Sequence, residues 1–173
     1  MAVHGKNYTW RGKEFSRKLE RHIGKNLDMA AIFLTNDIKQ SFGNSGVTGQ
    51  RSGATRAQRA ANRSQPWGPP NVDTGHLKRN TGWDRPSGRP GVRRIGTGIG
   101  NKQSVGYAMW LEFGTRGGYV IKAKGAKVLA NKATGQVFGK TVIHPGILPR
   151  PFLRPSLHRN RRKLRKMIMR PMR

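Results

Sequence analysis

The chain has 173 residues, of which 35 are Lys or Arg and 7 are Asp or Glu, so its formal net charge at pH 7 is +28. With 34% hydrophobic residues, 23 Gly and 10 Pro, it suits a single domain over residues 1–173 that has one modest core and long loops. The lack of Cys excludes disulfides and thiolate sites, and no apolar run is long enough to predict a signal peptide or a membrane span.

An amphipathic helix is expected near the start of the chain, ending near Ser41 to Gly43. Its apolar residues recur at three- and four-residue spacing, which is the period of one helix face. They are Phe15, Leu19, Ile23, Leu27, Ala31, Leu34 and Ile38. Four of the seven acids lie in or beside this helix, namely Glu14, Glu20, Asp28 and Asp37. The helix is therefore a candidate face for basic neighbours.

Apolar periodicity stops between Gly43 and Pro70, where Gly, Ser, Asn, Gln and Arg dominate. Such a composition cannot bury enough surface to offset the entropy of ordering it, which predicts a mobile basic loop or arm over residues 43–70. Its cations are Arg51, Arg56, Arg59 and Arg63. Two interpretations stay open, a solvated linker and an arm that contacts DNA or a partner.

The middle of the chain predicts short elements. Residues 73–77 look like a turn leading into a short element, residues 83–91 like a loop, and residues 92–99 like a strand whose glycines supply a bulge or the following turn. Residues 107–115 favour a short helix over a strand. Tyr107 and Leu111 are one helical turn apart, and Gly114 stands where a helix takes a left-handed residue after its end.

Residues 119–123, 127–130 and 136–143 are rich in β-branched residues and separated by Gly-containing turns, which predicts a meander of antiparallel strands. A final helix is expected from Arg154 to Pro171, with Pro155 in its first turn and Leu157, Leu164 and Ile168 on one face. The predicted fold is α+β. A long N-terminal helix packs on a small antiparallel sheet, and a basic helix and tail occupy residues 154–173.

Charge is one-sided after Glu112, because residues 113–173 contain no acid. The cations expected on the final helix are Arg159, Arg161, Arg162, Lys163, Arg165 and Lys166. A basic run without counter-ions on its own segment favours contact with a polyanion or an acidic protein over a solvated face. Few aromatic residues interleave with these cations, so contact with the backbone of duplex DNA, without sequence reading, fits better than stacking on bases.

Catalytic chemistry has few candidates in this sequence. Glu112 is the sole acid after Asp84, and the five His residues are scattered without a partner at metal-ligand spacing. The glycines of residues 96–100 lack the lysine spacing of a phosphate-binding loop. We therefore expect no enzyme activity, no catalytic or metal-binding residue and no cofactor. Glu112 itself lies among apolar residues, so we expect it to pair with Arg116 or with a basic group of a neighbouring subunit.

Three ordered blocks resemble a known family. They are Thr74-Gly75-x-Leu77, then Tyr107-Ala108-x-x-Leu111-Glu112-Phe113-Gly114-Thr115, and then His144-Pro145-Gly146 followed by Pro151-Phe152-Leu153-x-Pro155-x-Leu157. Together they resemble the head-to-tail joining, or tail completion, proteins of the neck of long-tailed bacteriophages. The chain departs from that family by Ser156, where Ala is usual, by its basic 43–70 segment and by its extreme charge.

This resemblance implies a homo-oligomeric ring between the portal or adaptor and the tail terminator or tail tube. The ring would surround double-stranded DNA in the virion neck after assembly in the host cytoplasm, without membrane contact. Tyr107, Leu111 and Phe113 would anchor the fold, Glu112 and Arg116 would make polar contacts, and Phe152 and Leu157 would dock the last helix. The alternative from another class is a free basic nucleic-acid-binding protein, associated with DNA packaging or ribosomes.

Overall fold

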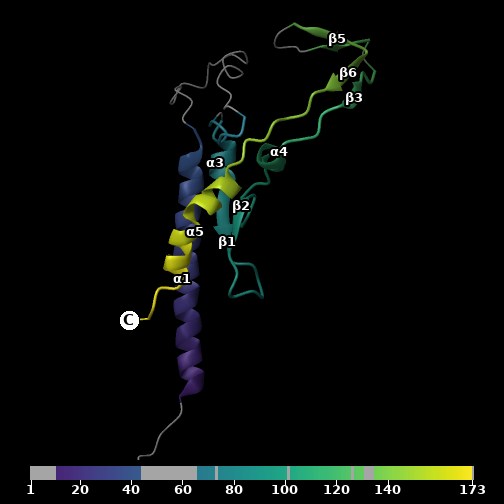
Figure 1. The fold of residues 1–173 in the computed structure, drawn as a ribbon. Helices are drawn as coiled ribbons and strands as arrows, with labels where there is room; N and C mark the ends of the chain where they lie inside the picture. Colours follow the sequence, from purple (N-terminus) through teal and green to yellow (C-terminus); the bar gives the residue numbers. More distant parts are fainter. Residues whose placement is uncertain are drawn as a thin grey trace, which may run out of the picture.

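The computed structural model describes residues 11–43, 66–72, 74–100, 102–125, 127–130 and 135–172. It has the expected α+β architecture, with a long N-terminal helix, small antiparallel sheets and a basic C-terminal helix (Figure 1). Within the described residues, no helix has both the length and the apolar character needed to cross a membrane.

Helix α1 spans Gly12–Ser41, so the N-terminal helix expected from the apolar spacing is confirmed. Its 30 residues rise about 1.5 Å each, which makes it about 45 Å long. Its C-terminal half buries Ala30, Leu34 and Ile38 in the core. The N-terminal half extends beyond the other elements (Figure 1), and its apolar side chains are exposed, with Phe15 at 56%. The stripe is therefore continuous in sequence but covered over only part of its length.

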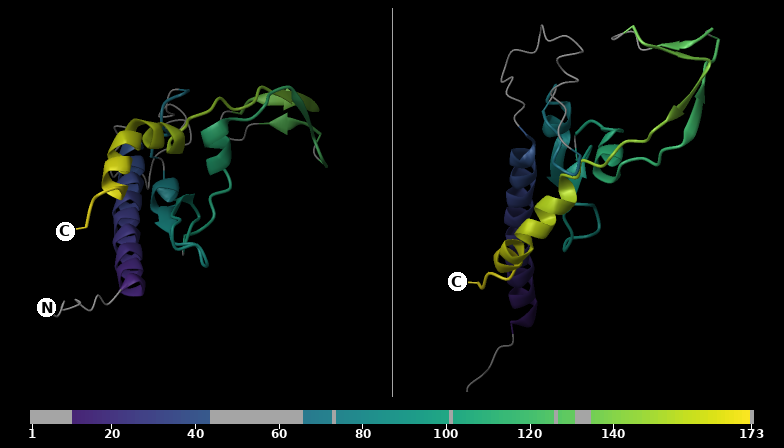
Figure 2. Two further views of the ribbon diagram at one scale, coloured as in Figure 1. Left: turned by 60° about the horizontal axis from the view of Figure 1, so that its bottom comes forward. Right: turned by 45° about the horizontal axis from the view of Figure 1, so that its top comes forward.

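The core lies where helix α5, Leu153–Ile168, packs across the C-terminal half of α1 (Figure 2). Phe152, just before α5, is 1% exposed, and its ring centroid lies 5.2 Å from that of Phe42 at the end of α1. The remaining members of the core cluster come from both helices, from the start of helix α4 (Ala108–Phe113) and from the segment before it; they are Ala30, Leu34, Ile38, Val105, Ala108 and Leu164. Burial of apolar area is the main force that holds these elements together.

Helix α3, His76–Asn80, leads directly into strand β1, Thr81–Asp84, which pairs antiparallel with β2, Arg94–Thr97. The strand expected over residues 92–99 is confirmed. Gly96 lies within it, whereas Gly98 and Gly100 serve the turn that follows, with a φ of +67° at each. The loop prediction for residues 83–91 is wrong at its start, because Trp83 and Asp84 belong to β1. Their pairing with β2 is a contact between segments, which the composition of residues 83–91 does not reveal.

The predicted strands after α4 exist but do not form a meander. Strand β3, Tyr119–Lys122, pairs with β6, Thr141–His144, while β4, Leu129–Ala130, pairs with β5, Val137–Gly139. The chain thus runs out along β3 and β4 and returns along β5 and β6, forming a projection that we call the arm (Figure 1). Alternation of side chains marks a strand but does not choose its partner, so this pairing could not be predicted.

Helix α4, Ala108–Phe113, confirms the short helix expected here. Gly114 follows with a φ of +74°, and a Cβ at this position would lie 2.6 Å from the carbonyl oxygen of Ile147. Glycine is therefore required both by the backbone conformation and by the close approach of the returning chain. The final helix is also confirmed, with Pro155 in its first turn and its end at Ile168, before Pro171.

The segment predicted as a basic loop, residues 43–70, has its two ends held together. Gly43 and Asn71 form a parallel β-bridge, in which the N–H of Gly43 donates to Pro70 and the N–H of Val72 donates to Gly43. Residues 44–65 lie outside the described residues, and with them Arg51, Arg56, Arg59 and Arg63.

Candidate functional site

Helix α5 is the most basic surface that the structure describes. Its 16 residues carry no acid and seven cations, namely Arg154, Arg159, Arg161, Arg162, Lys163, Arg165 and Lys166. Ser156 and Leu164 are buried against α1, whereas Arg162, Arg165 and Lys166 recur at three- and four-residue spacing on the opposite, exposed side. We call these three residues, together with the flanking Arg161, the basic face.

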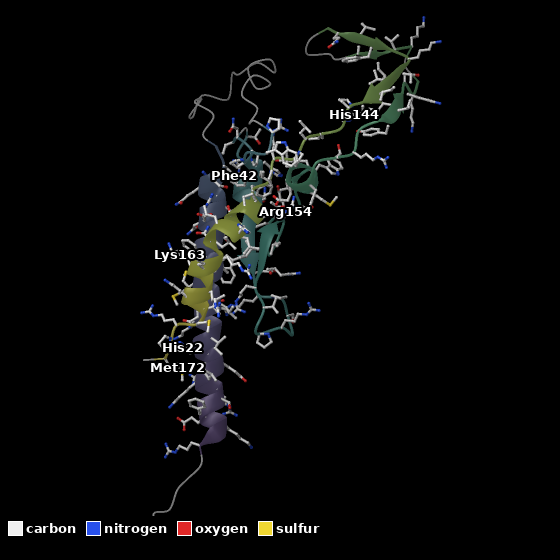
Figure 3. The ribbon with its side chains drawn as sticks, viewed as in Figure 1. His22, Phe42, His144, Arg154, Lys163 and Met172 are labelled. Carbon is white, nitrogen blue, oxygen red and sulfur yellow. The ribbon has the colours of Figure 1, made fainter. Side chains whose placement is uncertain are left out.

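Two cations that were expected on this surface make contacts inside the chain instead. Arg159 forms an ion pair with Asp37 of α1 at 2.7 Å. The Nζ atom of Lys163 lies 4.1 Å from the centroid of the Phe33 ring (Figure 3). In contrast, no carboxylate of the described residues lies within ion-pair distance of any residue of the basic face.

These unneutralised cations oppose helix formation. Arg161 and Arg165 are four residues apart, as are Arg162 and Lys166, and each like-charged pair at this spacing costs a helix about 0.2–0.5 kcal/mol. The like charges of the basic face thus destabilise α5 slightly in the isolated chain. Helix α5 is held in place by its packing against α1 and by contacts at its two ends.

Glu112 of α4 holds the N-terminal end of α5. The carboxylate is 3% exposed and accepts the backbone N–H groups of Phe152, Leu153 and Arg154 at 2.8, 3.0 and 2.9 Å. The first N–H groups of a helix have no partner within the helix, and its N-terminus carries a partial positive charge, so a buried carboxylate is stabilised there. Glu112 is therefore a helix cap.

The ion pair expected for Glu112 is made by a residue other than Arg116. The Nε atom of Arg154 donates to the Glu112 carboxylate at 3.3 Å, and its guanidinium also lies 4.6 Å from the centroid of the Phe113 ring (Figure 3). The prediction of Arg116 is thus corrected, and the basic partner of Glu112 within the chain is Arg154. Arg116 is exposed beyond the end of α4, whereas α5 brings Arg154 back to the carboxylate.

Asn26 and His22 of α1 hold the other end of α5. Asn26 is buried, and its Nδ2 atom donates to the carbonyl oxygens of Ile168 and Arg170 at 3.2 and 3.0 Å. The Nε2 atom of His22 lies 2.7 Å from the same Arg170 oxygen (Figure 3). The last carbonyls of a helix also have no partner within it, so α5 is capped at both ends by residues of other elements. The basic face is therefore held in a fixed orientation.

The three family-like blocks meet in space beside this helix. The N–H of Thr115 donates to the carbonyl of Ile147 at 2.9 Å, and the N–H of Arg150 donates to the carbonyl of Leu111. Leu77, Leu111 and Leu153 all pack against the core cluster. In the first block, the hydroxyl of Thr74 accepts the N–H of His76, and Gly75 has a φ of +74°. Pro151 and Pro155 flank the start of α5.

Some of the roles expected for these residues are wrong. Tyr107 and Phe113, which were expected to anchor the fold, are exposed, because they lie on the side of α4 that faces away from the core. Leu157, which was expected to dock α5, is 51% exposed, and Ser156 occupies the buried position instead. Leu111 and Phe152 do pack in or against the core as expected.

Most acids of the described residues are used to join elements together. Asp28 binds both Arg93, at 2.5 Å, and Arg85, and so ties α1 to the segments flanking the β1–β2 turn. Burial raises the pKa of Asp28, but hydrogen bonds from Arg85 and Arg93 outweigh this and bring the pKa below its ordinary value of 3.8. The hydrogen bond from Arg94 likewise lowers the pKa of Asp84. These carboxylates already pair with arginines of other segments, so they do not neutralise the basic face.

Sequence reasoning missed Asn26 and His22, although one signal was present. Asn26 interrupts the apolar stripe three residues after Ile23 and four before Ala30, and a polar residue at such a position needs a buried partner. No group of three or more His, Asp or Glu side chains that could hold a metal ion occurs within the described residues. Comparisons with protein-family models, with curated proteins and with solved structures find no match to this chain.

Proposed function

We propose that this protein is a structural subunit, without catalytic activity, of the neck of a tailed bacteriophage. Several copies form a ring between the portal or adaptor and the tail terminator or tail tube, and the ring surrounds the double-stranded DNA that passes from head to tail. The protein then resides in the virion at the head-to-tail interface, after assembly in the host cytoplasm.

The observation that carries this proposal is the basic face of α5, which is capped at both ends and unneutralised within the described residues. Neutralising phosphates releases the counterions condensed on duplex DNA, which makes such a surface a favourable site for the DNA backbone. Because the basic face is held in a fixed orientation, it suits a static contact with DNA that lies along a channel. A net charge of +28 also opposes the assembly of identical subunits unless a polyanion offsets their mutual repulsion.

The phage context is supported by the three blocks that resemble the head-to-tail joining family. In this chain they pack together around Leu111, Glu112 and Phe152, as expected of segments that form a common core. Gly114 and Glu112 have structural roles in that arrangement, which accounts for the residue types in the central block.

A free nucleic-acid-binding protein would share the affinity for DNA but not the location. The proposal is tested by deleting the gene from the phage that encodes it and imaging the infected-cell lysate by electron microscopy. Heads and tails are expected to accumulate unjoined, and wild-type protein supplied in trans should restore complete particles.

Two variants sharpen this experiment. The α5 triple variant changes Arg162, Arg165 and Lys166 to Gln. The control triple variant changes Lys25, Arg89 and Lys102 to Gln, which removes the same charge from exposed sites on other segments. The control is expected to restore joined particles and the α5 triple variant is not. Normal joining without the protein would contradict the proposal and favour the free nucleic-acid-binding protein.

A further inference from the structure

The arm exposes apolar side chains that nothing in the described chain covers. Val120 and Ile143 face each other across β3 and β6 and are 52% and 69% exposed. Val137 and Phe138 of β5 are exposed as well. A two-stranded ribbon is only marginally stable in water, and an apolar ribbon that projects from the core is a site for association. The arm therefore needs a partner surface.

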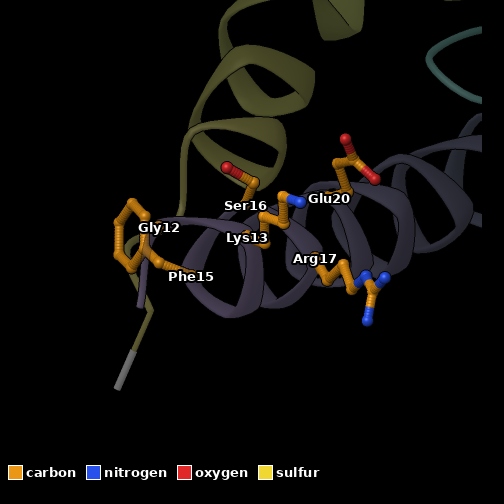
Figure 4. Close-up of a pocket in the computed structure, with 6 residues that line it drawn as sticks. All are labelled: Gly12, Lys13, Phe15, Ser16, Arg17 and Glu20. Carbon is orange, nitrogen blue, oxygen red and sulfur yellow. The ribbon is translucent and has the colours of Figure 1, made fainter. Parts of the chain in front are cut away.

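A second uncovered apolar surface lies on the first turns of α1. Phe15, Leu19 and Ile23 continue the core stripe beyond the end of α5 and are exposed there. A shallow depression lies on the same turns, with Phe15 at one side and Glu20 at the other (Figure 4). Among the acids that the structure describes, Glu20 alone has no cation within ion-pair distance. We call this surface the overhang.

The arm and the overhang lie at opposite ends of the molecule in every view (Figures 1 and 2), so one chain cannot bring its own two surfaces together. Their chemistry is nevertheless complementary. Lys122 is on the same side of β3 as Val120, because residues two apart in a strand point the same way, and it is exposed. A lysine beside an apolar pair on the arm thus matches the unpaired Glu20 beside the apolar stripe of the overhang.

We propose that the arm of one copy docks on the overhang of the next copy of the same chain. Val120 and Ile143 cover Phe15 and Leu19, and Lys122 pairs with Glu20. The contact joins two different surfaces, so it repeats head to tail and closes into a ring or continues as a filament. This inference deepens the proposed function and rests on it for the identity of the partner.

The positive charge of both surfaces makes this association depend on ionic strength. Lys13, Arg17, Lys18 and Arg21 surround the overhang, and the arm carries further lysines, so two approaching copies repel each other. Salt screens this repulsion, since the Debye length falls from about 10 Å at 0.1 M to about 3 Å at 1 M, while the apolar contact persists. Duplex DNA can replace salt by neutralising the same cations. Self-association is therefore expected to strengthen with ionic strength, opposite to the behaviour of DNA binding.

The test is sedimentation velocity of the full chain across a range of NaCl concentrations. The arm variant, Val120→Thr with Ile143→Thr, keeps β-branched residues in the strands, and the overhang variant, Phe15→Gln with Leu19→Gln, keeps good helix formers. Each is expected to weaken self-association at high salt by about tenfold or more, equivalent to about 1.4 kcal/mol. The matched control, Met29→Gln with Ile32→Gln, changes exposed apolar residues further along α1, outside the overhang, and is expected to associate as wild type.

Mixing the two variants gives the decisive result. Each variant retains one intact surface, so a 1:1 mixture is expected to form heterodimers that grow no further, and circular dichroism checks that each variant is folded. Failure to form heterodimers, or loss of association in the arm variant alone, overturns the arm-to-overhang contact while leaving the ring proposal standing. Open filaments from the wild type support the contact and contradict the ring, whereas a monomer at every salt concentration and on DNA overturns both.

Discussion

Replacing Glu112 by Gln removes the charge of the cap at the start of α5 and one of its two acceptor oxygens. The carboxylate receives the N–H groups of Phe152 and Leu153 on one oxygen, and the N–H and Nε–H of Arg154 on the other. A glutamine keeps one acceptor and turns an NH2 group toward the remaining donors, so at least one backbone N–H loses its partner.

The magnitude follows from these contacts. A buried donor left without an acceptor costs about 1–3 kcal/mol, and the lost charge at a partly buried helix N-terminus costs up to about 2 kcal/mol more. We expect Glu112→Gln to lower the free energy of unfolding by about 2–4 kcal/mol, a large part of the roughly 5–15 kcal/mol typical of folded proteins. The assay is urea unfolding followed by far-UV circular dichroism.

Glu14→Gln is the matched control, because Glu14 is exposed and its salt bridge to Lys18 lies on the protein surface. It is expected to leave the free energy of unfolding nearly unchanged. In Glu112→Gln, amide hydrogen exchange should also accelerate at residues 152–154. The acceleration should be larger there than at the other residues of α5. Equal stability of the two variants, with unchanged exchange at the start of α5, would refute the assignment of Glu112 as its cap.

Further outcomes are expected from the core and from the ion pairs. Phe152→Ala should cost about 3–5 kcal/mol in urea unfolding because the ring is fully buried, whereas Leu157→Ala, at an exposed position of the same helix, should cost well under half of that. Because hydrogen bonds from Arg85 and Arg93 bring the folded-state pKa of Asp28 below 3.8, this group adds stability above pH 3.8 that is lost as the pH falls through the lower folded value. In acid titrations followed by circular dichroism, Asp28→Asn should show less of this loss between pH 4 and the acid limit, and an unchanged acid profile would contradict the role of the pair.

Local features of the fold could be predicted from the sequence. The spacing from Phe15 to Ile38 is a property of one segment, and it correctly indicated α1. Gly114 correctly marked the end of α4, because its position one residue past a helical turn signals a positive φ. The exposure of Phe15 and Leu19 could not be predicted, since burial depends on where α5 ends and not on the stripe itself.

Contacts between segments far apart in the chain could not be predicted from the sequence. The sequence identified Glu112 as a carboxylate in need of a partner, but its main partners are backbone N–H groups 40 to 42 residues later, and every residue type other than proline supplies such a group. The arm shows the same limit. Its strands lie where they were expected, yet the pairing of β3 with β6, and not with β4, is decided by the whole ribbon. The basic face, in contrast, could be located because its charges lie on one periodic helix.

The central claim is that the basic face of α5 contacts the DNA backbone, and the salt dependence of binding to a duplex of mixed sequence tests it most directly. Each phosphate neutralised contributes about 0.9 to the slope of log K against log salt concentration, so the α5 triple variant is expected to lower the slope by about 2.7. The control triple variant should retain the slope of the wild type. Equal slopes for the wild type and the α5 triple variant would show that these cations do not meet the phosphates.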